Sequence, residues 1–355
     1  MLIMGRSKKI RVAVLFGGRS GEHEVSLRSA ASVMQHMDKE RFEVVPVTID
    51  KYGRWRENGK EVVFPPYPNS AVLNVDVVFP VIHGPLCEDG TIQGLLELAE
   101  VPYVGCGVLA SAVGMDKDVA KRLARDAGVA VVPYLCLTVD EWKNSPAVFE
   151  KLCSGKLGYP VFIKPANLGS SVGVHKVHAA SELASSLEDA FQYDLKVLVE
   201  RAINAREIEV AVLESADPSS QPIISVPGEV CPTHEFYSYE AKYLDENGAS
   251  LNIPADLTPE QVQAARDMAA KVFASLCCEG MARADLFLER GSGVLYFNEI
   301  NTIPGFTSIS MYPKMMEASG IAYGELLSRL IDLAIARHKR KKQLLREFAD
   351  ITRLP

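Results

Sequence analysis

Apolar runs and amphipathic segments alternate along the first third of the chain. The amphipathic segments, such as EVSLRSAASVMQHM and GTIQGLLELAE, have apolar residues at helical spacing. The apolar runs between them predict buried strands. These runs are IRVAVLFGG, FEVVPVTID, VDVVFPVIHG and the shorter PYVGCG. Strands that alternate with helices predict a parallel, wound α/β domain, here over residues 1–115.

The middle of the chain has a different pattern. The helix DKDVAKRLARDAG opens a segment in which YPVFIKPANLGSSVGVHKV predicts two strands joined by a glycine–serine loop. The helix SELASSLEDAFQY and the strand KVLVERAI follow. This order predicts an α+β domain with antiparallel pairing over residues 116–200.

Residues 201–355 are expected to form a third domain with several strands, the helix TPEQVQAARDMAAKVFASLCC and a closing hairpin. A polar stretch at about residues 227–253 shows little periodicity. Loops of this length inside a compact domain are usually functional lids or disordered segments. Aromatic side chains within it, among them Phe236 and Tyr243, favour a lid.

Composition and charge exclude several classes of protein. A hydrophobic share of 48% and a charged share of 23% are those of an ordinary soluble protein. The net charge of −7 argues against general nucleic-acid binding, and the basic run ARHKRKKQLLR is interpreted as a solvated helical tail. No apolar segment is long enough to span a membrane, and the first apolar run is too short for a signal peptide. The 7 cysteines form no CxxC pair, which indicates reduced thiols and a cytoplasmic location.

Candidate chemistry begins at the closing hairpin. If Gly291, Ser292 and Gly293 form its loop, then Arg290 faces Val294, Asp285 faces Glu299, and Arg283 faces Asn301. Like charges directly opposed are destabilising unless something lies between them, and a hard divalent cation such as Mg²⁺ suits carboxylate and amide oxygens. The alternative is a solvated polar face, and a register error of one residue would remove the pairing.

A phosphate partner would give a magnesium site its chemistry. In KPANLGSSVG, the residues Gly169–Gly173 allow backbone N–H groups to approach an anion, and Lys164 adds charge at the root of this loop. The spacing differs from that of a P-loop, and a plain hairpin turn explains the segment equally well. Lys117 is a second candidate for phosphate, although a lone lysine is more often a surface residue.

The first glycine-rich segment, FGGRSGEHEVSL, follows a strand and opens a helix, as a dinucleotide-binding loop does. Its spacing is not GxGxxG, however. Glu22 and Glu24 at the helix N-terminus would repel a pyrophosphate and suit a substrate ammonium better. Ordinary stabilisation of the helix N-terminus is the alternative role for either glutamate, at about 0.3–1 kcal/mol.

Seven motifs together resemble those of the D-alanine–D-alanine ligases, in the ATP-grasp superfamily. The resemblance covers about residues 10–335, and its specificity lies in the order of the motifs, since each alone is weak or moderate. The loop HGPLCEDG departs from the usual pattern at Pro85 and Cys87, which concerns local loop geometry only. The motifs are GGRSGEHEVSL, HGPLCEDGTIQG, MDKDVAKRL, KPANLGSSVGV, YEAKY, MARADLFL and NEINTIPGFTSISMYP.

The resemblance implies a three-domain ATP-grasp fold of mixed α/β and α+β class, with ATP held between two antiparallel sheets. It implies two Mg²⁺ (or Mn²⁺) ions on Asp285, Glu299 and Asn301. It also implies three sets of nucleotide contacts. Lys117, Lys164 and the loop with Ser171 would contact the phosphates. Glu200 and Glu207 would contact the adenine and ribose, and Phe236 and Lys242 would close over the nucleotide from the lid.

The implied activity is the ATP-dependent joining of two D-alanines, through an acyl phosphate, for peptidoglycan precursor synthesis in a homodimer. The resemblance implies that Glu22 and His83 lie at the first D-alanine, and that Glu22, Ser170 and Tyr243 lock the lid. It implies that Arg283 and the Gly305 N–H form the oxyanion hole, and that Ser310 with the Met311 backbone binds the second D-alanine.

Three other functions stay open at this point. A relative that joins D-alanine to D-lactate would differ in the second nucleophile, and such relatives tend to lack the tyrosine that stands here at Tyr243. An inactive nucleotide-binding regulator is disfavoured by the intact Asp285, Glu299, Asn301 and Lys164. The third possibility, a dinucleotide oxidoreductase, is suggested by the first glycine-rich segment alone.

Overall fold

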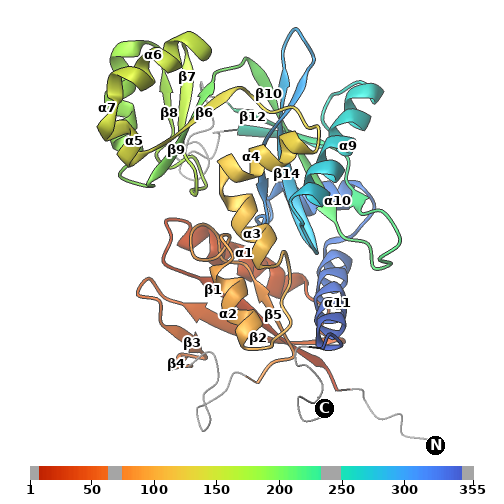
Figure 1. Cartoon of the computed structure of the whole chain (residues 1–355). Helices are drawn as coiled ribbons and strands as arrows, with labels where there is room; N and C mark the ends of the chain where they lie inside the picture. Colours follow the sequence, from red (N-terminus) through yellow and green to blue (C-terminus); the bar gives the residue numbers. More distant parts are fainter. Residues whose placement is uncertain (1–7, 63–73, 233–248, 346–355) are drawn as a thin grey trace, which may run out of the picture.

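The computed structural model describes residues 8–62, 74–232 and 249–345. Three β-sheets with flanking helices lie in this part of the chain, and they follow one another in the sequence (Figure 1). No helix in the described residues is long and apolar enough to cross a membrane.

The first sheet has the strand order β4-β3-β2-β1-β5. Its central strand, β1 (Ile10–Gly17), pairs in parallel with β2 (Phe42–Ile49) and β5 (Val77–Pro80), as the alternation of strands and helices predicts. The short antiparallel strands β3 (Trp55–Glu57) and β4 (Lys60–Glu61) extend the edge beyond β2 and were not foreseen. The segment PYVGCG forms only an isolated bridge, between Tyr103 and Val78.

Four helices accompany the first sheet or lead away from it, and three of them match the predicted segments. The unforeseen one directly precedes the helix that carries Lys117, and Asp116 separates the two. The Asp116 carboxylate accepts the backbone N–H groups of Asp118 and Val119, so it caps the start of the later helix and fixes Lys117 as its first residue. The four helices are α1 (His23–His36), α2 (Thr91–Leu98), α3 (Val108–Met115) and α4 (Lys117–Asp126).

The second sheet is antiparallel, as predicted, with the order β6-β9-β7-β8. Its hydrophobic core includes Ile163, Leu183 and Val199. The strands are β6 (Tyr134–Thr138), β7 (Val161–Pro165), β8 (His175–Val177) and β9 (Lys196–Arg201), and the helices are α5 (Val139–Asn144), α6 (Pro146–Lys156) and α7 (Ala180–Ala190).

The third sheet is also antiparallel and has the order β13-β12-β10-β14-β15, with β11 against β10. Two of its strands lie at the ends of the stretch that was expected to lack regular structure. Residues 233–248 between them lie outside the described residues. The strands are β10 (Ala205–Leu213), β11 (Ile223–Ile224), β12 (Gly228–Pro232), β13 (Ala249–Asn252), β14 (Met281–Glu289) and β15 (Leu295–Asn301), and the helices are α9 (Pro259–Ser275), α10 (Met311–Ala318) and α11 (Tyr323–Lys342).

The β14–β15 hairpin has the predicted pairing at one end only. Asp285 faces Glu299 and Arg283 faces Asn301, but the register shifts immediately beyond Asp285. Asn298 is the extra residue of this β-bulge, because Leu286 pairs with Phe297. The expected pairing of Arg290 with Val294 is therefore wrong.

The turn of the hairpin shows the cause of that error. Glu289, not Arg290, pairs with Val294, since the Glu289 N–H donates to the Val294 carbonyl at 2.9 Å. The Arg290 N–H instead donates to the carbonyl of Asn204 at 2.8 Å. The loop is thus one residue longer than the glycines alone indicate, and the bulge restores the pairing near Asp285.

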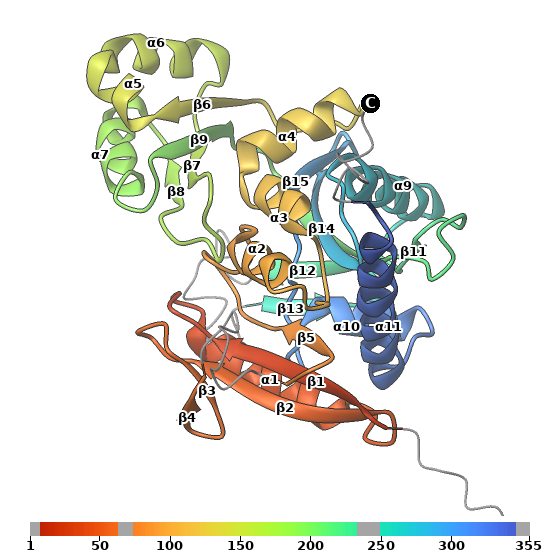
Figure 2. The same ribbon diagram turned by 60° about the horizontal axis from the view of Figure 1, so that its bottom comes forward.

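One hydrophobic core joins the first sheet to the C-terminal helices. α11 packs against α1, β5 and α10 (Figures 1 and 2). Phe306, which follows β15, makes an edge contact with Phe79 of β5 at 5.7 Å between ring centroids and a tilted contact with Tyr312 of α10, also at 5.7 Å. The segment between β15 and α10 is therefore fixed against the N-terminal sheet.

The basic run near the C-terminus is not simply a solvated tail. Arg337 is buried and donates to the carbonyls of Gly105 and Tyr103 at 2.6 and 2.8 Å. Lys341 pairs with Glu97 of α2 at 2.5 Å. These contacts tie the end of α11 to the α2–α3 region, which the sequence run by itself did not indicate.

Candidate active site

The β14–β15 hairpin carries four of the predicted site residues, and the structure brings them together. Asp285 and Glu299 are a directly opposed pair. Arg283 donates to both oxygens of Asp285 at 2.7 Å, and the Asn301 amide donates to Asp285 Oδ2 at 2.9 Å. All four residues are partly buried, which limits screening of their charges by water.

Arg283 lies between two carboxylates. Its second partner is Glu209 of β10, at 2.9 Å. Burial opposes the charge of Arg283, but Asp285 and Glu209 outweigh it and raise the pKa of the guanidinium. Arg283 is therefore a fixed cation in a site that also holds acids.

Two predicted phosphate-binding lysines lie beside this hairpin. Lys117 Nζ is 3.3 Å from Glu299 Oε2, and it donates to the carbonyl of Leu168, just before the glycine–serine loop, at 2.6 Å. Lys164, on β7, donates to Asn298 Oδ1 at 3.2 Å. The bulge residue thus turns toward the sheet of the central segment, where Lys164 lies.

Lys164 also contacts Glu200 of β9, at 2.5 Å. Burial opposes the charge of Lys164, yet Glu200, Glu299 and Glu207 together raise its pKa. These acids come from both antiparallel sheets, so Lys164 lies where the two sheets approach each other. Glu207 is on β10, opposite Val230 and Phe287.

Lys121 completes this cluster and was missed in the sequence analysis. It is fully buried, and its Nζ is 2.8 Å from Glu200 Oε1 and 3.3 Å from the carbonyl oxygen of Phe297. Lys121 follows Lys117 by one helical turn on α4, so the i, i+4 spacing could have found it. Both carboxylate oxygens of Glu200 therefore face an ammonium group, which is a second role beside its expected contact with adenine.

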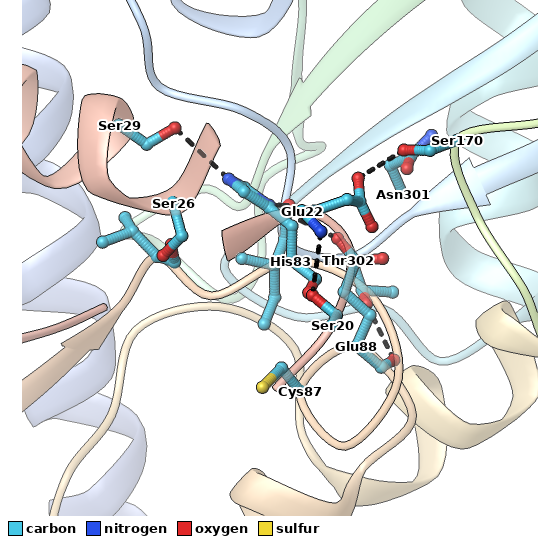
Figure 3. Close-up of polar contacts among 12 residues, drawn as sticks. Ser20, Glu22, Ser26, Ser29, His83, Cys87, Glu88, Ser170, Asn301 and Thr302 are labelled. Atoms are coloured by element: carbon cyan, nitrogen blue, oxygen red, sulfur yellow. Dashed lines mark hydrogen bonds and ion pairs between the residues drawn. The ribbon is translucent and has the colours of Figure 1, made fainter. Parts of the chain in front are cut away.

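The glycine–serine loop reaches across to the N-terminal part of the chain. Ser170 donates a hydrogen bond to the Glu22 carboxylate (Figure 3). Ser170 and Ser171 have φ of 55° and 58°, a left-handed conformation that is uncommon for residues other than glycine and that occurs often at functional sites. Glu22 stands at the N-cap position of α1 but makes no cap hydrogen bond there, so helix capping does not explain its side chain.

His83 is buried just after β5. Its Nδ1 is 3.2 Å from the Ile303 carbonyl oxygen and 3.6 Å from Glu88 Oε1, and its Nε2 is 3.2 Å from Ser29 Oγ (Figure 3). Burial alone would lower the pKa of His83, but the charges of Glu88 and Glu22 raise it. Glu88 and Ser29 were not identified from the sequence.

Gly305, Ser310 and Met311 lie between β15 and the first turn of α10. A Cβ atom at Gly305 would lie 2.7 Å from Ser310 Oγ, so a side chain there would displace the Ser310 hydroxyl. Ser310 is the N-cap of α10, yet it makes no cap bond, and its hydroxyl accepts the Thr307 N–H at 2.9 Å. A helix N-terminus without a side-chain cap is a favourable place for a carboxylate.

Three predicted residues, Phe236, Lys242 and Tyr243, lie outside the described residues. The donor set at the hairpin suits Mg²⁺, because two opposed carboxylates and an amide supply oxygen ligands only. In the described chain no group of three or more His, Cys, Asp or Glu side chains could hold a metal, and this candidate site combines two carboxylates with the amide of Asn301.

Comparisons with known proteins agree with this arrangement. Residues 11–106 match the family described as "D-ala D-ala ligase N-terminus", and residues 123–332 match "D-ala D-ala ligase C-terminus". D-alanine–D-alanine ligase A of Bradyrhizobium diazoefficiens is 55% identical over 374 residues, which cover 96% of this chain and 99% of the relative. A D-alanine–D-alanine ligase of Caldicellulosiruptor bescii is 46% identical, with 95% of this chain and 98% of the relative covered.

Solved structures give the same result. The D-alanine–D-alanine ligase of Coxiella burnetii superposes with a TM-score of 0.83 at 34% identity, covering 96% of this chain and 98% of that one. The VanG D-Ala:D-Ser ligase of Enterococcus faecalis superposes with a TM-score of 0.82 at 36% identity, covering 92% and 100%. The expected α/β ATP-grasp fold is thereby confirmed. The chain belongs to the D-alanine–D-alanine ligase family.

Proposed function

We propose that this protein uses ATP to join two D-alanine molecules into D-alanyl-D-alanine, a precursor for peptidoglycan. One observation carries the proposal. The Glu22 carboxylate, which suits a substrate ammonium, is hydrogen-bonded to Ser170 in the loop that follows the phosphate-binding candidate Lys164. This contact brings an ammonium-binding group beside a phosphate-binding loop, and phosphorylation of an amino acid's carboxylate requires that the two substrates lie side by side.

The nucleotide would lie between the second and third sheets. Lys117 and Lys164 carry the positive charge for its phosphates, and the backbone of the loop with Ser171 would cover them. Glu207 would contact the ribose, and Glu200 would serve both the adenine and the two lysines beside it. Phe236 and Lys242 would close over the nucleotide from the lid.

Asp285, Glu299 and Asn301 would hold two Mg²⁺ (or Mn²⁺) ions. When bound, the metal would neutralise charge on the transferring phosphoryl group. Lys117 lies against Glu299, and Arg283 lies against Asp285. Positively charged side chains of the protein therefore balance part of the negative charge of these two acids.

The reaction would proceed in two steps. A carboxylate oxygen of the first D-alanine attacks the γ-phosphorus of ATP, which forms an acyl phosphate and releases ADP. Glu22 would hold the ammonium of this substrate, and Ser170 and Tyr243 would lock the lid over it. Exclusion of water matters here, because water would hydrolyse the acyl phosphate.

In the second step the amine of the second D-alanine attacks the acyl carbon. A tetrahedral oxyanion forms and then collapses, which expels inorganic phosphate. The attacking nitrogen loses one proton, which the departing phosphate can accept, and the peptide bond is left. Arg283 and the Gly305 N–H would stabilise the oxyanion, and loss of one such donor typically costs about 2.7–4 kcal/mol. Ser310 and the Met311 N–H, at the start of α10, would bind the carboxylate of the second substrate.

The three sheets support three domains, at about residues 1–115, 116–200 and 201–355, with the lid at about residues 227–253. We further propose a homodimer, which sedimentation would test. The 7 cysteines are all unpaired, which favours a reducing, cytoplasmic setting.

An assay of phosphate and ADP release across D-amino acids and D-hydroxy acids tests the activity. Release should require D-alanine, and mass spectrometry should find D-alanyl-D-alanine. ATP hydrolysis without an amino-acid requirement would refute the ligase assignment, and product formation with D-lactate or D-serine in preference to D-alanine would reassign the second substrate.

A further inference from the structure

Two side chains of the N-terminal part anchor the segment Ile303–Phe306 on both sides of Gly305. Ser29, on α1, accepts the Phe306 N–H at 3.3 Å. His83 bonds the Ile303 carbonyl through Nδ1 at 3.2 Å, and its Nε2 is 3.2 Å from the same Ser29 hydroxyl (Figure 3). Ser29 and His83 therefore form one hydrogen-bonded unit whose two ends hold Ile303 and Phe306, on either side of the Pro304–Gly305 peptide.

Both nitrogens of the His83 ring already have protein partners. Nδ1 faces two acceptors, the Ile303 carbonyl and the Glu88 carboxylate, so Nδ1 must carry a proton. Only 4% of His83 is exposed, and its backbone carbonyl accepts a hydrogen bond from Ser20 at 2.6 Å. This ring is placed to orient other protein groups, which differs from the direct substrate contact that the resemblance implies.

We propose that Ser29, His83 and Glu88 are positioning residues that fix the direction of the Gly305 N–H toward the oxyanion. The inference rests on the proposed function, because it needs Gly305 to be an oxyanion donor. The Gly305 N–H lies in the plane of the Pro304–Gly305 peptide. This plane is joined on one side to the anchored Ile303 carbonyl and on the other to the anchored Phe306 N–H. A donor held in advance is worth more than one that must reorient during the reaction.

Other contacts hold the same segment in place, next to the hydrogen-bonded unit of Ser29, His83 and Glu88 (here called the clamp). Tyr323 donates to the Phe306 carbonyl at 2.6 Å and lies 3.1 Å from the Ser32 hydroxyl, one turn beyond Ser29 on α1. With Ser29, both backbone groups of Phe306 are therefore held by side chains. Glu88, in the same loop as His83, lies 3.6 Å from Nδ1. Glu88 and Glu22 raise the pKa of the ring, and burial raises the pKa of Glu88 itself.

The test compares two buried serines on the same helix. Ser29→Ala removes the bonds to Phe306 and His83. Ser26→Ala is the matched control, because Ser26 is equally buried but bonds Gly17 N and the Val81 carbonyl, at 2.8 and 2.6 Å. We expect kcat of Ser29→Ala to fall between about tenfold and a hundredfold, with KM for ATP and D-alanine nearly unchanged. Ser26→Ala should keep kcat within about twofold.

A second readout separates positioning from general destabilisation. A phosphinate dipeptide analogue, which mimics the tetrahedral intermediate, should bind Ser29→Ala more weakly by the same factor as kcat falls, while binding of ADP is retained. Equal kcat losses in the two serine variants, or a parallel loss of ADP binding, would overturn the clamp. Absence of D-alanine-dependent phosphate release by the unaltered protein would instead defeat the proposed function.

Glu88→Gln keeps the size of the side chain and provides the test if Ser29→Ala does not fold. Without the Glu88 charge, burial should lower the pKa of His83, which NMR of ring-labelled histidine can follow. We therefore expect the pH at which kcat declines to be lower in Glu88→Gln than in the unaltered protein, in parallel with the pKa of His83. An unshifted His83 titration together with an unshifted kcat profile would contradict the role of Glu88.

Discussion

The Lys121 ammonium lies 2.8 Å from the Glu200 carboxylate, in a part of the site that water does not reach. Lys121 is 0% exposed and Glu200 is 2% exposed. Lys164 holds the other oxygen of Glu200 at 2.5 Å. A single carboxylate therefore links α4 to the sheet from which Lys164 reaches the proposed phosphate site.

Replacement of Lys121 by methionine should destabilise the protein strongly, because it removes one partner of a buried ion pair. Such a change typically costs about 3–5 kcal/mol. Arg122→Met is the matched control, since Arg122 is adjacent, half-exposed and paired with Asp118 at 3.0 Å, and exposed pairs contribute about 0–1 kcal/mol. Urea unfolding measures both, and equal losses would contradict the special position of Lys121.

Glu200 should contribute to stability in a pH-dependent way. Burial raises the pKa of this carboxyl, but Lys121 and Lys164 outweigh it and lower the pKa from 4.5 to about 2. Because the folded pKa is depressed, the stabilisation is present above pH 4.5 and is lost as the pH falls toward 2. Urea titrations at several acidic pH values should show a steeper loss of stability in the unaltered protein than in Glu200→Gln. The same slope in both would remove this assignment.

Asp285→Asn should sharply reduce turnover and leave the fold intact. The change removes a charge from the proposed metal site but keeps the shape of the side chain, and we expect kcat to fall about a hundredfold or more. Asp189→Asn, on α7 and distant from the hairpin in sequence, is the control, because Asp189 is partly exposed and contacts only His175 among the ion pairs described. Turnover and Mn²⁺ binding by electron paramagnetic resonance report the result; unchanged Mn²⁺ binding would argue against Asp285 as a ligand.

Arg337→Met should separate the buried from the exposed part of the basic run. It leaves the carbonyls of Gly105 and Tyr103 without their donor, and each buried unsatisfied group costs about 1–3 kcal/mol. Lys339→Met, two residues further along α11 and exposed, should change the unfolding free energy by less than about 0.5 kcal/mol. Thermal unfolding of the two variants gives the comparison, and similar midpoints would mean that the run is merely a solvated tail.

The hairpin shows how far local pattern reaches. The pairing of Asp285 with Glu299 could be predicted, because side chains in a strand alternate and the turn residues are recognisable. The turn was predicted one residue too short, and the bulge at Asn298 compensated for the error. That bulge depends on contacts outside the hairpin, such as the bond of the Arg290 N–H to Asn204 and of Lys164 to Asn298.

Lys117 and Lys121 show the same limit on one helix. The motif identified Lys117, and the i, i+4 spacing places Lys121 on the same face of the helix, but nothing local shows that Lys121 is buried against Glu200. Its importance comes from Glu200, which is remote in the sequence. Ser29 and His83 are likewise joined only where α1, the end of β5 and the segment after β15 meet.

The sequence alone determined the longer strands and several of the helices, the order of the motifs and the chemical types of the site residues, because periodicity and turn chemistry are local properties. The tertiary structure decided which charges neutralise one another and which backbone groups are held in place. Those outcomes depend on segments remote in the sequence that exclude water together, and burial is what gives an ion pair or a hydrogen bond its strength.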